Sequence, residues 1–209
     1  MKKLSIVLTV LFALATLISA AYATEETKVG DGAKMPEILK KAYEKSAANA
    51  AYTLTAKVKV QGQEMSSVTK AFFKDAKHYR MDSEMMGQKT RMVVDGDMAW
   101  TYMEAANMIM KMPVPPSPTE VKNTVTYVEG KEGDNATFTC TDTTTKIKVV
   151  IAVNPKENLP VKMTTFDEKG ALMSESTYSD WKFDKIDDSM FKKPEGAKEM
   201  EAPKMPEQK

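Results

Sequence analysis

The chain has very little cysteine and histidine, two residue types that often build catalytic or metal-binding sites. Its 209 residues include one cysteine, Cys140, and one histidine, His78. A single cysteine cannot form an internal disulfide, and these two side chains are too few for a zinc site of cysteine and histidine ligands. The sequence also lacks a glycine-rich phosphate loop, a serine nucleophile elbow and a paired-histidine motif. We therefore predict a protein that is not an enzyme and that uses no cofactor, with Cys140 as a small buried residue in a strand.

The chain has no excess of charge of either sign. Its formal charge is +1, and it becomes −1 once Lys2 and Lys3 are removed. Lysines, arginines and acidic residues are interspersed, which is typical of a solvated surface. A near-neutral chain lacks the basic surface that nucleic acid requires, so we expect no nucleic-acid partner.

A long apolar run occurs only at the N-terminus. Lys2 and Lys3 precede the run from Leu4 to Ile18, and the small-x-small triplet Ala21-Tyr22-Ala23 follows it. This pattern is typical of a secretory signal peptide that is cleaved after Ala23. The run is shorter than the ~20 residues that cross a bilayer, and no later segment is long and apolar enough. We predict a periplasmic protein that does not span the membrane.

The remaining chain divides into a leader, one domain and a tail. Residues 24–34 are polar and contain glycine, which predicts a flexible leader, and residues 192–209 are rich in Pro, Glu and Lys, which predicts a disordered tail. Between them, residues 35–191 have the size of a single domain. Apolar residues at helical spacing predict one amphipathic helix from Pro36 to about Ala50.

Alternation of apolar and polar residues from Tyr52 to Phe183 predicts ten or eleven short strands joined mainly by hairpins. A short helical turn is expected at Asp188 to Phe191. The fold class that follows is mainly β (α+β), with a single curved antiparallel sheet forming an incomplete β-barrel and the N-terminal helix against its concave face. One helix cannot cover so large a sheet, so part of the apolar face should remain available. The expected strands are 52–60, 64–74, 77–85, 88–94, 97–103, 107–112, 121–128, 136–141, 146–153, 161–166 and 171–183.

Methionine is abundant in one part of the predicted sheet. Nine of the 17 methionines lie between Met81 and Met112, and alternation separates methionine and aromatic positions from charged ones. Methionine is unbranched and deformable, so a methionine-rich surface suits ligands of variable shape such as acyl chains, although ordinary core packing explains any single methionine. The residues that we expect to line a lipid-binding cavity are Met81, Met92, Val94, Met98, Trp100, Tyr102, Met108 and Met110.

Two other functions are compatible with the same residues. Met108, Met110 and Met112 lie on one side of a predicted strand, and thioethers are soft ligands for Cu(I). Neighbours on one face of a strand are ~7 Å apart, however, which is wide for two thioethers to share an ion. Alternatively, the face is a filled core, and a sheet edge or the proline-rich segment from Pro113 to Pro118 contacts an envelope protein.

Three segments carry a resemblance to a known family. They are Phe72 to Met81, Val93 to Tyr102 with its Asp95-Gly96 turn, and Asp187 to Ala197. In order and spacing, the chain resembles the periplasmic lipoprotein carrier and sorting (LolA/LolB-like) family. The resemblance implies an incomplete curved barrel with an apolar cavity for the acyl chains of lipids or lipoproteins, and a possible envelope protein partner. The carrier's lid-latching arginine has no counterpart, because this sequence has Lys74-Asp75-Ala76 in that region.

Overall fold

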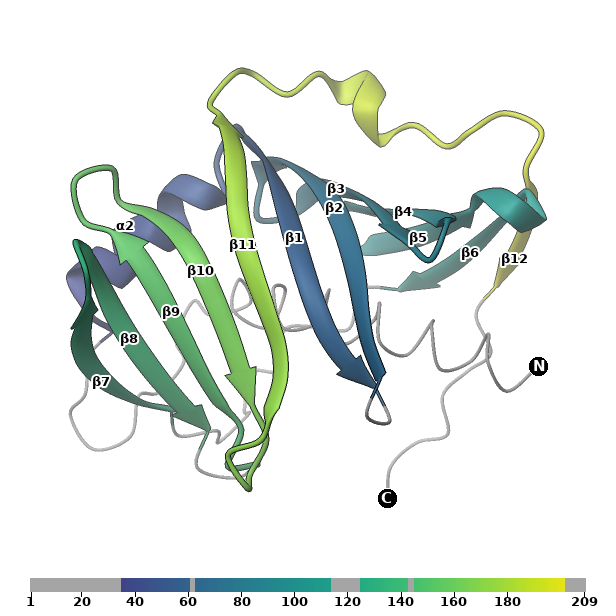
Figure 1. Ribbon diagram of the computed structural model, residues 1–209. Helices are drawn as coiled ribbons and strands as arrows, with labels where there is room; N and C mark the ends of the chain where they lie inside the picture. The colour runs from purple at the N-terminus through teal and green to yellow at the C-terminus, as the bar shows by residue number, and fades with distance from the viewer. Residues whose placement is uncertain (1–34, 61–62, 114–124, 143–144, 202–209) are drawn as a thin grey trace.

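Figure 1 shows a computed structural model of the protein, which describes residues 35–60, 63–113, 125–142 and 145–201. The predicted signal peptide (1–23) and the predicted leader (24–34) lie outside the described residues. So do residues 114–124, which include most of the proline-rich segment and the start of the strand predicted at 121–128. The last eight residues, 202–209, lie outside them as well.

Strands make up most of the described chain. The element order is α2 (Glu37–Ser46), β1 (Ala50–Val60), β2 (Gln63–Asp75), β3 (His78–Met85), β4 (Gln88–Asp95), β5 (Met98–Met103), η2 (Glu104–Ala106), β6 (Met108–Pro113), β7 (Val125–Glu132), β8 (Asn135–Asp142), β9 (Lys148–Asn154), β10 (Leu159–Phe166), β11 (Leu172–Lys182), η3 (Asp188–Phe191) and β12 (Lys198–Glu201). Here η denotes a short 3-10 helix. The predicted turn at Asp188–Phe191 is confirmed, as are ten of the eleven predicted strands. The eleventh was predicted at 121–128, whereas β7 runs from Val125 to Glu132 and residues 121–124 lie outside the described residues.

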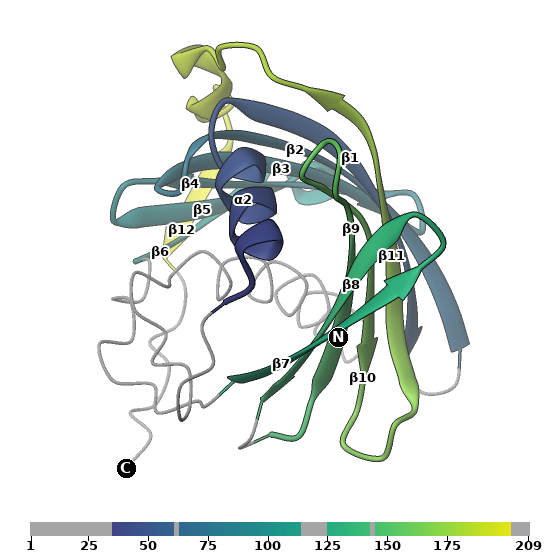
Figure 2. The ribbon, with the colours of Figure 1, turned by 90° about the vertical axis from the view of Figure 1, so that its left-hand side faces the viewer.

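All twelve strands belong to one sheet, in the order β12-β6-β5-β4-β3-β2-β1-β11-β10-β9-β8-β7. Neighbouring strands are antiparallel, except that β12 runs parallel to β6. The sheet curves strongly and stays open, because β12 and β7 form its two edges (Figure 2). The predicted fold class, a single curved sheet with a helix on its concave face, is confirmed.

Helix α2 covers one half of the concave face. Leu39 and Ala42 are buried against Phe138, Ile151 and Val153 of β8 and β9, and the helix also contacts β10 and β1. Its outer side is polar, with ion pairs at i and i+4 spacing. Burial of this apolar stripe therefore fixes the helix on the β8–β10 half of the sheet (Figure 2).

The helix is shorter than the sequence predicts. It ends at Ser46, and Ala50 already begins β1, where it pairs with Phe73 and is fully buried. Asn49 adopts a positive φ of 47°, which turns the chain from the helix into the strand. Alanine-rich residues favour a helix locally, but here strand pairing overrides that preference.

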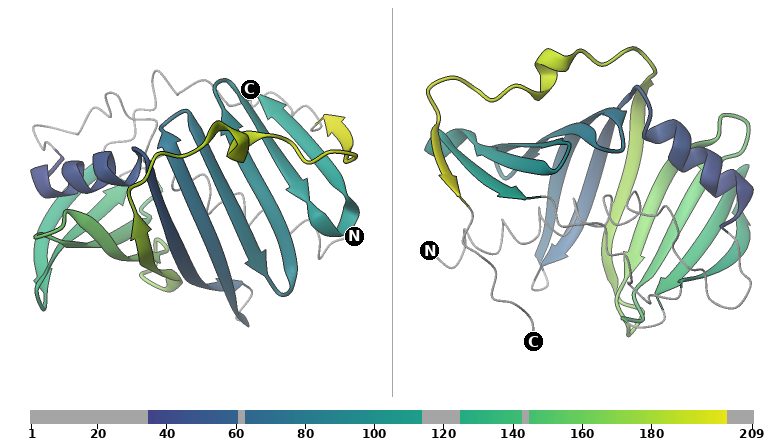
Figure 3. Two further views of the ribbon diagram at one scale, coloured as in Figure 1. Left: turned by 90° about the horizontal axis from the view of Figure 1, so that it is seen from above. Right: turned by 180° about the vertical axis from the view of Figure 1, so that it is seen from behind.

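A segment that we call the strap, residues 183–197, crosses the convex face of the sheet (Figure 3). Ile186 and Phe191 are buried against Val93, Trp100 and Ile109 of β4, β5 and β6. The chain then adds β12 to the sheet edge, in register with β6. The prediction of a disordered tail from residue 192 is therefore wrong for residues 192–201, because apolar anchors before them bring this polar segment to an open sheet edge.

Among the described helices, none combines the length and the apolar character that crossing a bilayer requires.

Candidate functional site

Strand register defines which residues share the concave face. Residues directly opposite each other in a sheet point to the same side, and Tyr52, Ala71, Met81 and Met92 form one such row from β1 to β4. Another row joins Ile151, under α2, through Met163 and Ser176 to Ala56. The helix-covered half and the β1–β6 half therefore form one continuous concave surface.

The concave surface of β1–β6 is uncharged. From Ala50 to Val58 in β1 and across β2–β6, the described positions on this side carry no Asp, Glu, Lys or Arg. The charged residues of these strands alternate with them and face the convex side, as Lys70, Asp82 and Arg91 do. The methionines on the concave side are Met65, Met81, Met85, Met92, Met103, Met108, Met110 and Met112.

Five of the eight predicted cavity residues lie on this surface. Met81 and Val94 are buried in it, and Met92, Met108 and Met110 are half-buried. The sequence prediction did not include Met65, Met85, Met103 and Met112, which register places on the same side. Alternation within their own strands already grouped Met85 and Met112 with predicted cavity residues, whereas only the register between strands places Met65 and Met103 on this surface.

The three other predicted cavity residues lie on the opposite face. The two-residue loop between β4 and β5 sets Asp95 opposite Met98 and Val93 opposite Trp100, so Met98, Trp100 and Tyr102 are convex. Trp100 is buried under the strap, and Tyr102 is half-buried beside the same cluster. Met98 is 48% exposed. These residues therefore do not share a face with the other five.

An aromatic cluster lies on the concave surface beside the methionines. Tyr52 stacks on Phe73 with ring centroids 5.9 Å apart, and Phe73 stacks on Tyr79 at 5.0 Å. Trp181 of β11 contacts Tyr52 with a centroid distance of 4.4 Å. A bulge in β11 makes this possible, because Asp180 has a φ of 56° and two residues of β11 oppose Tyr52. The sequence prediction did not include Trp181.

Burial keeps three titratable side chains on the concave surface of the helix-covered half in their neutral forms. Burial raises the pKa of the Tyr178 phenol to about 12 and that of the Cys140 thiol to about 12. Burial also raises the pKa of Tyr127. Desolvation disfavours the charged forms of these groups, so at neutral pH they contribute polar but uncharged side chains to this surface.

Hydroxyl groups cross the middle of the concave surface. Thr69 of β2 and Ser83 of β3 are directly opposite and hydrogen-bond to each other, with 2.8 Å between their oxygens. On β10 and β11, Thr165 and Ser176 are buried, and their hydroxyl oxygens have no hydrogen-bond partner among the described residues. A pair of unsatisfied buried hydroxyls is uncommon in a folded protein.

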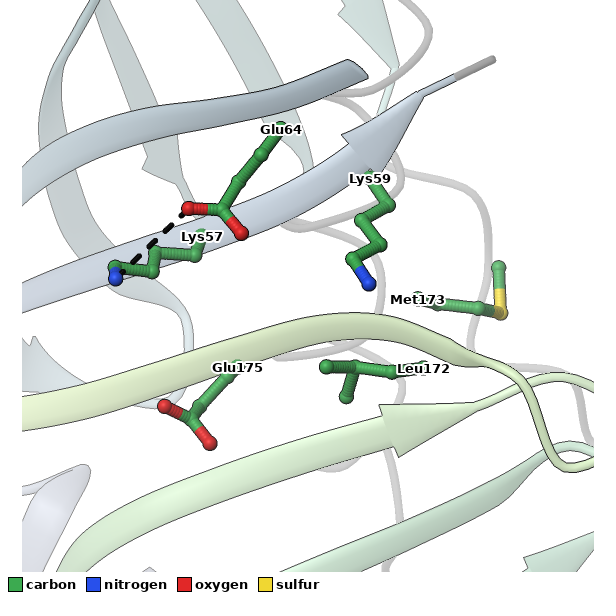
Figure 4. A pocket seen from close by; sticks show the side chains of 6 residues that line it. All are labelled: Lys57, Lys59, Glu64, Leu172, Met173 and Glu175. Carbon is green, nitrogen blue, oxygen red and sulfur yellow. Dashed lines mark ion pairs between the residues drawn. The ribbon is translucent and has the colours of Figure 1, made fainter. Parts of the chain in front are cut away.

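A separate shallow pocket of about 160 Å³ lies at the ends of β1, β2 and β11 (Figure 4). Lys57 and Glu64 form an ion pair of 3.8 Å on its wall, and Lys57 alternates with concave residues, so it faces the convex side. None of the predicted cavity residues lines it. Its exposed mixed charges make it a poor site for an acyl chain. The lining residues are Lys57, Lys59, Glu64, Leu172, Met173 and Glu175.

The convex face also holds His78, whose ring lies between two carboxylates. Its Nδ1 is 2.8 Å from Asp75, and its Nε2 is 3.6 Å from Asp95. Within the described ranges, however, no three His, Cys, Asp or Glu side chains are grouped so that they could hold a metal ion. The thioether alternative rests on Met108, Met110 and Met112, which lie on one side of β6 as predicted.

Comparison with known proteins finds a similar fold in a solved structure. No protein-family model matches this sequence, and no curated protein matches it either. An uncharacterized conserved protein from Thermus thermophilus has a similar structure, with a TM-score of 0.58 and 12% identity over 79% of this chain and 98% of that one. At this identity, the similarity concerns the fold alone.

Other solved structures are similar at lower TM-scores. A LolA superfamily protein from Nitrosomonas europaea has a TM-score of 0.41 and 13% identity over 75% of this chain and 96% of its own. A putative outer membrane lipoprotein-sorting protein domain from Vibrio parahaemolyticus has a TM-score of 0.40 and 14% identity, covering 73% and 95%.

Proposed function

We propose that this chain is a noncatalytic periplasmic protein that binds or carries lipids or the acyl chains of lipoproteins. The observation that carries the proposal is the uncharged concave surface of β1–β6, on which eight methionines lie beside an aromatic cluster. Helix α2 packs mainly on β9, β10 and β1. Among the described elements, it therefore leaves the methionine-bearing strands β3–β6 without a covering helix.

The physical basis of the proposed binding is burial of hydrocarbon. Each methylene that moves from water into an apolar site contributes ~0.8 kcal/mol. Unbranched thioether side chains such as those of Met92 and Met110 adapt to chains of different length and bend. An uncharged surface also avoids the cost of desolvating ionised groups when a chain covers it.

The two tryptophans allow a direct test, because they lie on opposite faces of the sheet. In the Trp100→Phe variant, Trp181 is the single reporter and lies beside Tyr52 on the concave side. We expect dioctanoyl phosphatidylglycerol to shift the emission of this delipidated variant to shorter wavelength. We also expect native mass spectrometry of the exported full-length protein to detect copurifying lipid.

The matched control is Trp181→Phe, which leaves Trp100 under the strap on the convex side. Its emission should not respond to the same lipid. A silent Trp181 reporter, together with protein that is free of lipid after export, would contradict the proposal.

A second candidate function is an envelope protein-interaction module. The observation that favours it is the edge strand β7, where Val128 is 64% exposed. An exposed edge strand can add a strand from another chain. This candidate predicts that Val128→Lys abolishes binding of an envelope partner, whereas the lipid-binding proposal predicts unchanged lipid affinity in the same variant.

A further inference from the structure

Two buried hydroxyls on the concave surface lack hydrogen-bond partners. Ser176 of β11 is 1% exposed and Thr165 of β10 is 3% exposed. Neither hydroxyl oxygen has a partner within the described part of the chain. Leaving a buried hydroxyl unpaired is destabilising, so such groups in a native protein usually serve a bound molecule or water.

The two hydroxyls are close enough to act together. Ser176 is directly opposite Met163, and Ser174 is directly opposite Thr165. Ser176 and Thr165 are therefore diagonal neighbours on the same face, with Cα atoms ~7 Å apart. The Thr69–Ser83 pair on the same surface is satisfied internally at 2.8 Å, so lack of a partner is particular to Ser176 and Thr165.

Their cross-strand neighbours are apolar, apart from Ser174 opposite Thr165. Ala56 is opposite Ser176 on one side and Met163 on the other, and Val149 is opposite Thr165. Met163 is directly opposite Ser176 and two residues from Thr165 on the same strand, and it packs against the cluster under α2. Its sulfur accepts a weak hydrogen bond from the Tyr178 hydroxyl at 3.9 Å. Its unbranched side chain can change rotamer at low cost and open access to both groups.

We propose that Ser176 and Thr165 donate hydrogen bonds to the carbonyl oxygens of the ester or amide groups that link acyl chains to a polar head. This inference rests on the proposed function and adds the chemical class of the ligand. A hydrocarbon chain offers no acceptor, whereas each linking carbonyl offers one. With these two donors, the concave surface binds acyl-ester or acyl-amide lipids in preference to ether-linked or purely hydrocarbon ones.

The test compares two lipids that differ only in the carbonyl. Dioctanoyl phosphatidylglycerol has two ester carbonyls, and its dioctyl ether analogue has the same chains and head group without them. For the Trp100→Phe protein, we expect the ester lipid to bind about tenfold more tightly than the ether lipid. This ratio corresponds to the two ordinary hydrogen bonds that the ether lipid cannot accept. The same protein carrying Ser176→Ala and Thr165→Val should bind both lipids equally.

Stability provides an independent readout. Removing an unpaired buried hydroxyl from the lipid-free protein should leave the melting temperature unchanged or raise it by about 2–4 °C. A variant with unchanged or higher stability and a lost ester preference distinguishes ligand recognition from misfolding. The matched control, Thr164→Val with Thr177→Ala, changes convex positions of the same strands and should keep the preference.

The outcomes separate the inference from the function on which it rests. Equal binding of the ester and ether lipids by the protein with both hydroxyls intact would overturn the inference and leave the proposed function standing. An ester preference that survives the double substitution would overturn it too, because the hydroxyls would then serve buried water alone. Binding of neither lipid would overturn both proposals. If the double variant fails to fold, the single variants Ser176→Ala and Thr165→Val provide the same comparison.

Discussion

At the scale of single residues, Cys140 shows how the concave surface suppresses reactivity. The thiol lies in β8 and packs against the cluster under α2. Burial raises its pKa from 9.0 to about 12. The thiolate is the nucleophilic form of cysteine, so a thiol with this pKa is almost entirely protonated at neutral pH. Cys140 is thus a packing residue in the folded protein.

We therefore predict slow alkylation of Cys140. At pH 8, a pKa near 12 in place of 9.0 lowers the thiolate fraction about a thousandfold, and reaction with iodoacetamide should slow by at least that factor. Mass spectrometry of the folded protein over time measures the rate. The control is the same protein in denaturant, which should react within minutes. Equally fast labelling of the folded protein would show that the thiol is accessible.

At the scale of elements, the strap is held by apolar anchors and by polar contacts of Asp187 within it and of Glu199 in the adjoining strand β12. Ile186 and Phe191 provide the apolar contacts. Hydrogen bonds from the Ser189 side chain and backbone lower the pKa of Asp187, and contacts from Lys111 and Lys193 lower the pKa of Glu199 in β12. These carboxylates lie at the solvent-exposed surface, so each contributes weakly and depends on salt.

The strap should loosen in acid. Because the folded pKa values of Asp187 and Glu199 lie below their ordinary values of 3.8 and 4.5, their contacts stabilise the strap above those values and are lost as the pH falls through the lowered ones. We expect hydrogen-exchange protection of residues 186–201 to fall between pH 7 and pH 3, while that of β9 and β10 stays unchanged. Glu199→Gln should show looser β12 amides already at pH 7. Constant protection down to pH 3 would contradict this role.

At the scale of the whole molecule, the two faces of the sheet carry different kinds of side chain. In β1–β6, the convex face carries the charged residues and the strap, whose Phe191 packs with Val93 and Trp100. The concave face carries the methionines, the aromatic cluster and the buried hydroxyls. The helix and the strap thus cover different halves and different sides of one sheet (Figures 2 and 3).

Substitutions on the two faces should therefore have separable effects. Phe191→Ala removes a buried ring on the convex side and should lower the free energy of unfolding by about 3 kcal/mol without changing lipid affinity. The double variant Met92→Gln, Met110→Gln should lower the free energy of unfolding by about 1 kcal/mol. It should also weaken lipid binding about tenfold, because amides replace thioethers against the acyl chain. Urea unfolding and Trp181 fluorescence measure the two quantities. Weaker lipid binding in Phe191→Ala protein that remains folded would contradict this separation.

The strands and most turns could be predicted from the sequence, because alternation and turn residues act over a few neighbouring positions. Asp95-Gly96 marked the β4–β5 hairpin, where Gly96 has a φ of 65°, and period-two runs marked ten strands. The candidate site was only partly predictable. Alternation says which residues share a face within one strand, but it does not relate that face to the next strand.

Register, bulges and long-range contacts decided the rest. The β4–β5 loop length placed Trp100 opposite Val93 on the convex side, whereas the bulge at Asp180 turned Trp181 to the concave side. The position of β12 depends on apolar anchors more than 70 residues along the chain from its partner β6. The sequence by itself thus determined the strands and their two-sided chemistry. Tertiary structure decided which strand sides lie on the same face of the sheet, because strand pairing is set by contacts between distant residues.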